Sequence, residues 1–326
     1  MTMQYGTIKG IDKPVSRIVQ GTMMLSTDRM EEGIALLDMV FAHGVTTFDC
    51  AHVYGGGQSE RVMGEWMQKH GNREQVVILS KGCHHNQDRK RVTPYDLTAD
   101  LMDSLARLKS DYIDLYVLHR DNPDVPVGPI VETLNEHYAA GRIRGFGGSN
   151  WHHTRLAEAN AYADQHGLVP MTVSSPNFGL AEQVLNPWGP GCVTLAGPQE
   201  DEARQWYLAN EMPVFAYSSL ARGFFSGRFR SDEQQKAEEI LEAVAIHAYG
   251  HPVNYERLAR VEVLAQEKGA TVPQIAIAYS LHSALDVYPL VASYNEKEME
   301  DNLKAFDISL TAEECAWLDL RSEARQ

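Results

Sequence analysis

Residues 46–82 read TTFDCAHVYGGGQSERVMGEWMQKHGNREQVVILSKG and alternate between two kinds of pattern. Apolar runs lie at both ends, at residues 46–51 and 76–82, and residues 59–70 form a helix-like segment between them. Apolar runs that contain β-branched residues and lack strict alternation are typical of strands buried on both faces. The stretch therefore predicts a strand, a helix and a second strand parallel to the first.

The same alternation continues along the whole chain. Strands are predicted at residues 17–21, 46–51, 76–82, 113–119, 144–150, 171–177, 213–220 and 287–293. Helices are predicted at residues 30–43, 59–70, 95–108, 131–140, 154–166, 200–210, 255–268 and 296–306. Eight such units in 326 residues favour a closed (β/α)8 TIM barrel, and no G-x-G-x-x-G motif follows the first strand to support a Rossmann fold. Because no linker interrupts the pattern, one barrel domain is predicted over residues 1–326.

Three segments depart from the simple alternation. Residues 3–13 precede the first strand and are expected to form a short β-hairpin with its turn at Lys9-Gly10. Long loops are expected after strands 6 and 7, at residues 179–198 and 221–254. In a barrel both loops lie at the C-terminal ends of the strands, where active sites are built, and loops of this length are often functional.

Composition narrows the function classes. The chain is 44% apolar but has no run of about 18 apolar residues, so a membrane span is not expected. The N-terminal residues lack the apolar region of a signal peptide, which predicts a cytoplasmic protein. A formal net charge of −15 disfavours nucleic acid as a partner. The four cysteines form no C-x-x-C pair and are predicted to be free thiols.

Four polar side chains fall at the predicted ends of three consecutive strands. They are Asp49, Tyr54, Lys81 and His119. Asp49 and Lys81 each end an apolar run, and because buried charges are costly unless paired, they are expected to form an ion pair between neighbouring strands. Each residue alone is also typical of ordinary barrel packing. The four together indicate one site at the mouth of the barrel.

This set suits proton transfer to a carbonyl oxygen. The Lys81 ammonium is expected to lower the pKa of Tyr54 from its usual value of about 10, so that Tyr54 acts as general acid in reduction and general base in oxidation. Asp49 is expected to orient Lys81, and His119 to polarise the substrate oxygen. A cofactor must supply the hydride, because no side chain can do so.

Nearly the whole chain resembles the aldo-keto reductases. The segment FDCAHVYGGGQSE, residues 48–60, is similar to the family's F-D-T-A-x-x-Y-G-x-G-x-S-E, and SKG, YIDLYVLHR, GRIRGFGGSNW and YSSLARGFFSGRF match later family blocks in order. The resemblance implies an NAD(P)(H)-dependent oxidoreductase that reduces aldehydes, ketones or sugar carbonyls to alcohols. It also implies that the catalytic tetrad is Asp49, Tyr54, Lys81 and His119.

The resemblance further implies where a nicotinamide cofactor binds. Ser149 and Asn150 correspond to residues that hold the carboxamide, and Tyr217 to the ring that stacks on the nicotinamide. Three residues of the following loop correspond to the pyrophosphate side: Ser218, Leu220 and Arg222.

One position and one segment depart from the family pattern. Ser175 stands where the family has a glutamine that binds the carboxamide. The adenosine segment LVASYNEKEMEDN lacks the usual basic residues and contains Ala292, Ser293, Tyr294, Glu298 and Asn302. Glu298 would repel a 2′-phosphate and accept a hydrogen bond from a ribose hydroxyl, which favours NAD. NADP is the family default, and Lys297 and Lys304 keep it open.

Other function classes fit parts of the sequence. A nicotinamide-binding regulatory or sensor barrel with little turnover is the alternative to an enzyme. A metal-dependent hydrolase would need metal ligands, but the pairs His84-His85 and His152-His153 lack the expected spacing, so no metal site is predicted. The expected partner is a small carbonyl or alcohol substrate.

Overall fold

The computed structural model describes residues 2–325 and begins with a two-stranded hairpin. Strands β1 (Tyr5–Ile8) and β2 (Ile11–Ser16) pair in antiparallel fashion, and Gly10 makes the turn at a φ of 86°. The predicted hairpin is confirmed, although its second strand continues beyond residue 13. Within residues 2–325, no helix combines the length and apolar content that crossing a bilayer requires.

Eight parallel strands form a closed barrel, which confirms the predicted (β/α)8 fold. Their order around the barrel is β10-β3-β4-β5-β6-β7-β8-β9. Their bounds are β3 (Val19–Gly21), β4 (Thr47–Asp49), β5 (Val77–Gly82), β6 (Ile113–Leu118), β7 (Ile143–Ser149), β8 (Val173–Ser175), β9 (Val214–Ala216) and β10 (Val287–Val291). The strands lie where the apolar runs predict them, and most of them end earlier than the runs do.

The helices of the structure are more numerous than the predicted ones. Their bounds are α1 (Met30–Ala42), α2 (Gln58–His70), α3 (Pro94–Leu108), α4 (Val127–Ala139), α5 (His153–Gln165), α6 (Asp201–Ala209), α7 (Gln234–Ile240), α8 (Ala243–Tyr249), α9 (Pro252–Lys268), α10 (Val272–Leu281), α11 (Glu296–Leu303) and α12 (Ala312–Leu318). Helices α10 and α12 are additional to the prediction. The predicted loop at residues 221–254 is partly wrong, because α7 and α8 lie within it. Helix α4 starts before the predicted residue 131, since Pro129 is tolerated in its first turn.

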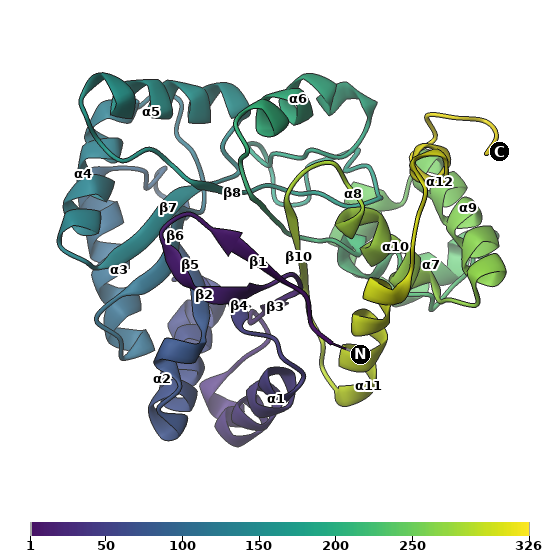
Figure 1. Ribbon diagram of the computed structural model, residues 1–326, viewed down its shortest axis with the longest axis horizontal. Helices are drawn as coiled ribbons and strands as arrows, with labels where there is room; N and C mark the ends of the chain where they lie inside the picture. Colours follow the sequence, from purple (N-terminus) through teal and green to yellow (C-terminus); the bar gives the residue numbers. More distant parts are fainter. Residues whose placement is uncertain (1, 326) are drawn as a thin grey trace. The chain divides into compact units, whose positions relative to one another are not determined.

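The chain divides into two compact units. The first unit comprises Met3–Ser175 and Ala292–Glu296. Figure 1 shows its helices α1 to α5, purple to teal, around strands β4 to β7, with the purple hairpin across the strands. Lys13 from the hairpin bonds Asp114 Oδ1 at 2.8 Å, at the start of β6, so the hairpin covers the N-terminal ends of the strands. Phe48 packs on Trp66 with ring centroids 5.3 Å apart, joining β4 to α2.

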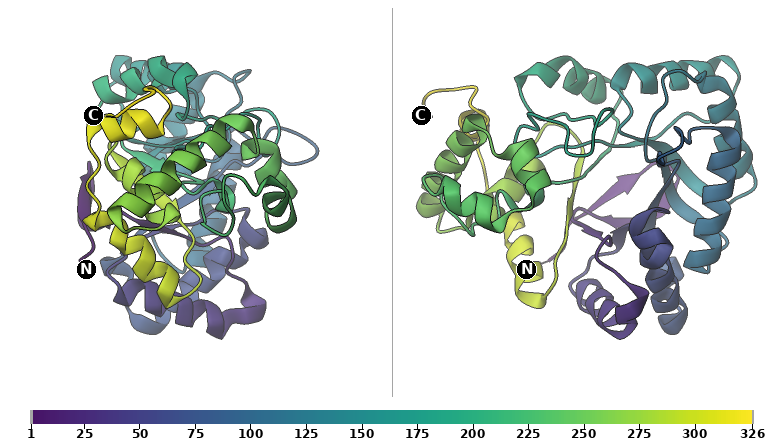
Figure 2. Two further views of the ribbon diagram at one scale, coloured as in Figure 1. Left: turned by 90° about the vertical axis from the view of Figure 1, so that its right-hand side faces the viewer. Right: turned by 180° about the vertical axis from the view of Figure 1, so that it is seen from behind.

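Among the described residues, the second unit comprises Thr2, Pro176–Val291 and residues 297–325. Its helices α7 to α10 and α12, green and yellow in Figure 2, contribute residues to one apolar core. The Phe224 ring lies 5.1 Å from Tyr255, 5.4 Å from Phe229 and 5.6 Å from Phe225, measured between centroids. This core anchors the chain that follows β9, which is the segment that the resemblance assigns to the cofactor.

Candidate active site

The four predicted catalytic residues lie together in the first unit. Asp49 is the last residue of β4, Lys81 lies in β5, His119 follows β6, and Tyr54 begins the short 3-10 turn η2 (Tyr54–Gly57). Lys81 Nζ donates to Asp49 Oδ1, and also to Tyr54 Oη at 3.1 Å and to the Cys50 carbonyl at 3.1 Å. Tyr54 Oη donates to Asp49 Oδ2 at 3.3 Å. Lys81 therefore links the carboxylate and the phenol, as the sequence predicts for the ion pair.

The glycines after Tyr54 make this arrangement possible. Gly55, Gly56 and Gly57 all have positive φ values, of 57°, 63° and 90°. A Cβ on Gly57 would lie 2.6 Å from the Arg107 guanidinium, so a larger residue would have to displace the Arg107 side chain. Because left-handed backbone strongly favours glycine, the motif YGGG sets the position of the tyrosine ring.

Two residues that follow the glycines, Ser59 and Glu60, anchor the turn. Ser59 Oγ lies 2.6 Å from Thr22 Oγ1, and Thr22 donates to the Asp49 carbonyl at 2.8 Å. Glu60 is fully buried, accepts from Ser80 Oγ at 2.7 Å, and pairs with Arg107 at 3.3 Å. The sequence prediction missed these positioning roles, although the residues form the S-E pair at the end of FDCAHVYGGGQSE.

The electrostatics of the site differ from the expectation for Tyr54. Burial and the Asp49 carboxylate outweigh the Lys81 ammonium and raise the pKa of Tyr54 to about 12, so the predicted lowering is wrong. For Lys81, burial lowers the pKa, but the Asp49 carboxylate and the Tyr54 oxygen outweigh it, and the net shift is upward. At neutral pH the site thus holds a charged ammonium beside a protonated phenol.

His119 is the second hydrogen-bonding group of the site. Its ring meets Tyr54 edge-on with centroids 5.9 Å apart. Burial and the nearby Lys81 charge keep the pKa of His119 well below its usual value, so the imidazole is neutral. Its Nδ1 is buried without a hydrogen-bond partner within residues 2–325. A phenol after β4 and a neutral imidazole after β6 are two groups that can donate to one carbonyl oxygen.

The residues predicted to hold a carboxamide lie beside His119 in the same unit. Asn150 Nδ2 donates to the His119 carbonyl at 3.1 Å, and Asn150 has a positive φ of 57°. Ser149 Oγ donates to the Ser175 carbonyl at 2.7 Å. Within residues 2–325, the Ser175 hydroxyl is buried with no hydrogen-bond partner. An unpaired buried hydroxyl is costly, and it fits a ligand amide at the position of the family's glutamine.

The residues predicted for the nicotinamide ring and the pyrophosphate lie together in the second unit. Tyr217 follows β9, and its ring centroid lies 5.7 Å from that of Trp188. Ser218, Ala221 and Arg222 have positive φ values of 55°, 50° and 53°. Leu220 accepts a backbone bond from Gly223 at 3.0 Å. Three non-glycine residues in left-handed backbone mark a strained loop, and strain of this kind clusters at ligand-binding segments.

The adenosine-site residues of the sequence prediction follow β10. Ser293 exchanges two hydrogen bonds of 3.3 Å with the buried Gln20 side chain, whereas Ala292 is exposed and Tyr294 is 63% exposed. Glu298 and Asn302 lie on α11, the first exposed and the second buried. Lys304 pairs with Asp301 at 2.8 Å.

Comparisons with known proteins point to one enzyme family. The model of the aldo/keto reductase family matches residues 17–321. Aldo-keto reductase YhdN of Bacillus subtilis is 28% identical over 247 residues, which covers 73% of this chain and 68% of that protein. The norsolorinic acid reductase stcV of Emericella nidulans is 24% identical over 309 residues, covering 90% and 73%.

The fold has a close counterpart among solved structures. A thermostable aldo-keto reductase in complex with the inhibitor epalrestat aligns with a TM-score of 0.72 and 23% identity, covering 98% of this chain and all of the other. The family match extends over nearly all of the barrel that carries Asp49, Tyr54, Lys81 and His119. The chain belongs to the aldo/keto reductase family.

Proposed function

We propose that the protein reduces aldehydes or ketones to alcohols with a reduced nicotinamide cofactor, and that Tyr54 delivers the proton. The observation that carries the proposal is the buried Lys81, which bonds both Asp49 and Tyr54 while His119 lies against the tyrosine ring. A structural ion pair would not need the phenol and the imidazole at its edge. Relatives of this family are oxidoreductases, in line with this chemistry.

The tetrad supplies the proton and holds the substrate. Tyr54 Oη donates its proton to the carbonyl oxygen as the oxygen gains charge. Lys81 stabilises the phenolate that remains, and Asp49 keeps the ammonium charged and oriented. The neutral His119 donates a second hydrogen bond that polarises the carbonyl. When bound, the nicotinamide cofactor supplies the hydride, and Ser149, Asn150 and Ser175 are the residues that would hold its amide.

We also propose that NADH is accepted at least as well as NADPH. Glu298 is exposed on α11 and Lys304 is paired with Asp301, so the exposed Lys297 beside Glu298 is the cation that remains for a 2′-phosphate, and the Glu298 carboxylate opposes it. The test is the ratio of kcat/KM for the two cofactors in the wild type and in Glu298→Lys. The substitution is expected to shift the ratio toward NADPH. A far higher kcat/KM with NADPH in the wild type would contradict NAD use.

The main experiment is a titration of the purified protein with NADPH and NADH by nicotinamide fluorescence, followed by a panel of aldehydes. Consumption of the reduced cofactor is expected, and Tyr54→Phe is expected to lower kcat by a factor on the order of 10²–10⁴ without abolishing cofactor binding. Saturable binding with no turnover on any carbonyl would instead favour the sensor barrel.

We place the enzyme in the cytoplasm, since all four cysteines are free, as in a reducing compartment.

A further inference from the structure

Arg222, in the strained loop after β9, is held between an aromatic ring and a carboxylate of the second unit. Its Cζ lies 5.3 Å from the centroid of the Trp188 ring, and its Nη2 donates to Glu242 Oε2. The Trp188 ring in turn lies 5.7 Å from the Tyr217 ring, measured between centroids. The guanidinium is therefore linked through Trp188 to the ring that the resemblance assigns to the nicotinamide.

The ion pair leaves part of the guanidinium unused. Nη2 carries the bond to Glu242, whereas neither Nη1 nor Nε of Arg222 has a hydrogen-bond partner within residues 2–325. Nε is enclosed, but Nη1 is not, so the end of the side chain formed by Nη1 and Nη2 is the part that a ligand can reach. A phosphate binds arginine through two neighbouring nitrogens. A phosphate at this end would therefore take Nη1 and compete with Glu242 for Nη2.

Glu242 can release Arg222 without disturbing the helix that it precedes. Its side chain is 71% exposed and makes no hydrogen bond that caps α8. The start of α8 is held instead by the Glu242 backbone carbonyl, which accepts from Ala245 at 2.8 Å and from Ile246 at 3.2 Å. Exposed ion pairs are weak because water solvates both charges. Exchange of Glu242 for another anion therefore costs little.

Arg222 keeps its place when Glu242 leaves. The Trp188 ring lies within the distance of about 6 Å at which an arginine and an aromatic face attract each other, and this contact does not involve Glu242. The backbone on both sides is also held, because Gly223 donates to the Leu220 carbonyl at 3.0 Å and the buried Phe224 to the Ala221 carbonyl at 3.1 Å. The guanidinium is thus a fixed cation whose anionic partner can change.

We propose that Glu242 is an internal competitor of the cofactor, which occupies Arg222 in the free protein and is replaced by the pyrophosphate of the nicotinamide dinucleotide. The inference deepens the proposed reductase function and rests on it. Glu242 acts through Arg222 and lowers the affinity for the cofactor. Because NADH and NADPH share the pyrophosphate, Glu242 affects both in the same way.

The test measures the Kd of NADH and of NADPH by nicotinamide fluorescence, with the protein alone and no carbonyl substrate. Glu242→Gln removes the charge and keeps the shape, and is expected to lower both Kd values by about two- to fivefold, the strength of one exposed ion pair. ADP-ribose, which contains the pyrophosphate but no nicotinamide, is expected to compete with NADH more tightly by the same factor.

A second variant checks that Glu242 acts through Arg222. Arg222→Asn removes the guanidinium, and asparagine tolerates the left-handed backbone at this position. In this background Glu242→Gln is expected to leave the Kd of NADH unchanged, because the two residues are coupled. A full gain in affinity there would overturn the proposal. Should Arg222→Asn fail to fold by circular dichroism, Arg222→Gln gives the same comparison.

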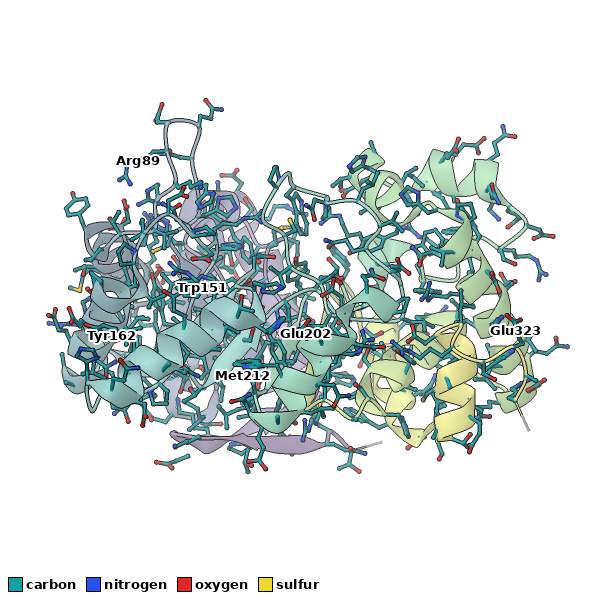
Figure 3. The ribbon with its side chains drawn as sticks, turned by 90° about the horizontal axis from the view of Figure 1, so that it is seen from above. Arg89, Trp151, Tyr162, Glu202, Met212 and Glu323 are labelled. Atoms are coloured by element: carbon teal, nitrogen blue, oxygen red, sulfur yellow. The ribbon has the colours of Figure 1, made fainter. Side chains whose placement is uncertain are left out.

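The control separates the contact from the net charge. The second unit carries other exposed carboxylates, of which Figure 3 labels Glu202 and Glu323, and the loss of any negative charge favours an anionic cofactor at long range. Glu239 is exposed on α7, three residues before Glu242, and accepts from Gln235 at 3.4 Å. Glu239→Gln is expected to keep the wild-type Kd.

The possible failures can be told apart. Equal gains in Glu239→Gln and Glu242→Gln overturn the competition and leave the reductase standing. An unchanged Kd in Glu242→Gln, in an enzyme that still oxidises the reduced cofactor with aldehydes, does the same. No binding of either cofactor by the wild type overturns both proposals.

Discussion

At the scale of single residues, the raised pKa of Tyr54 predicts different pH profiles for the two reaction directions. With a pKa of about 12, the phenol is protonated throughout pH 6–9, so reduction, which needs the protonated form, is expected to be nearly flat. Oxidation needs the phenolate, whose fraction rises about tenfold per pH unit below the pKa, so kcat/KM for an alcohol is expected to rise accordingly. Steady-state rates measured in both directions with one cofactor pair check this. A plateau of the oxidation rate near pH 7 would contradict the raised pKa.

Lys81 links catalysis to stability. Lys81→Met leaves the Asp49 carboxylate, only 3% exposed, without its partner, and such an uncompensated charge is expected to lower the free energy of unfolding by about 3–5 kcal/mol. The double variant Asp49→Asn with Lys81→Met removes both charges and is expected to recover most of this loss. Urea denaturation of the three proteins measures the effect. Equal destabilisation by the single and double variants would show that the charges do not stabilise each other.

At the scale of elements, one buried carboxylate helps to hold the hairpin against the strands. Asp114 is buried at the start of β6 and accepts from Lys13 at 2.8 Å and from the Ile78 backbone at 2.9 Å, and it pairs with Arg73 at 2.8 Å. Asp114→Asn keeps the shape but loses the charge, and is expected to cost about 1–3 kcal/mol of unfolding free energy with kcat unchanged. Asp12→Asn, an exposed position on the same hairpin, is the control in chemical denaturation. A fall in kcat for Asp114→Asn would tie the hairpin to catalysis.

An element could be predicted where its sequence pattern is typical of one kind of secondary structure. It could not be predicted where the pattern shows no period. The strand at VVILSKG is recognisable because an apolar β-branched run ends in a charged residue, and this also marks Lys81 as a candidate site residue. Helix α10 was missed because Ile275, Ala276, Ile277 and Ala278 are all fully buried, so its sequence shows no polar face to mark a helical period. The pKa of Tyr54 was predicted in the wrong direction because the sequence shows its charged neighbours but not the depth of its burial.

At the scale of the whole molecule, the cysteines report on global unfolding. Cys50 and Cys83 are fully buried, and burial raises the pKa of both thiols, that of Cys50 to about 12. Cys192 and Cys315 are partly exposed, and burial raises the pKa of Cys315 to about 11. A thiol reagent at pH 8 is therefore expected to label Cys192 first, and Cys50 and Cys83 only when the protein unfolds. Peptide mass analysis along a urea series, with Cys192→Ser as control, checks this order.

Because the loop after β9 is strained, we expect heating to inactivate the protein at temperatures below those at which its helices unfold. Left-handed backbone at Ser218, Ala221 and Arg222 costs about 1–2 kcal/mol per residue, and contacts of the surrounding chain must hold it in place. One of these contacts is the ion pair of Arg222 with Glu242, whose side chain is 71% exposed, and such surface pairs contribute little. On warming, this segment is expected to relax while the core around Phe224 is still packed. Activity lost on heating would then return on cooling from temperatures at which circular dichroism still shows the full helix content.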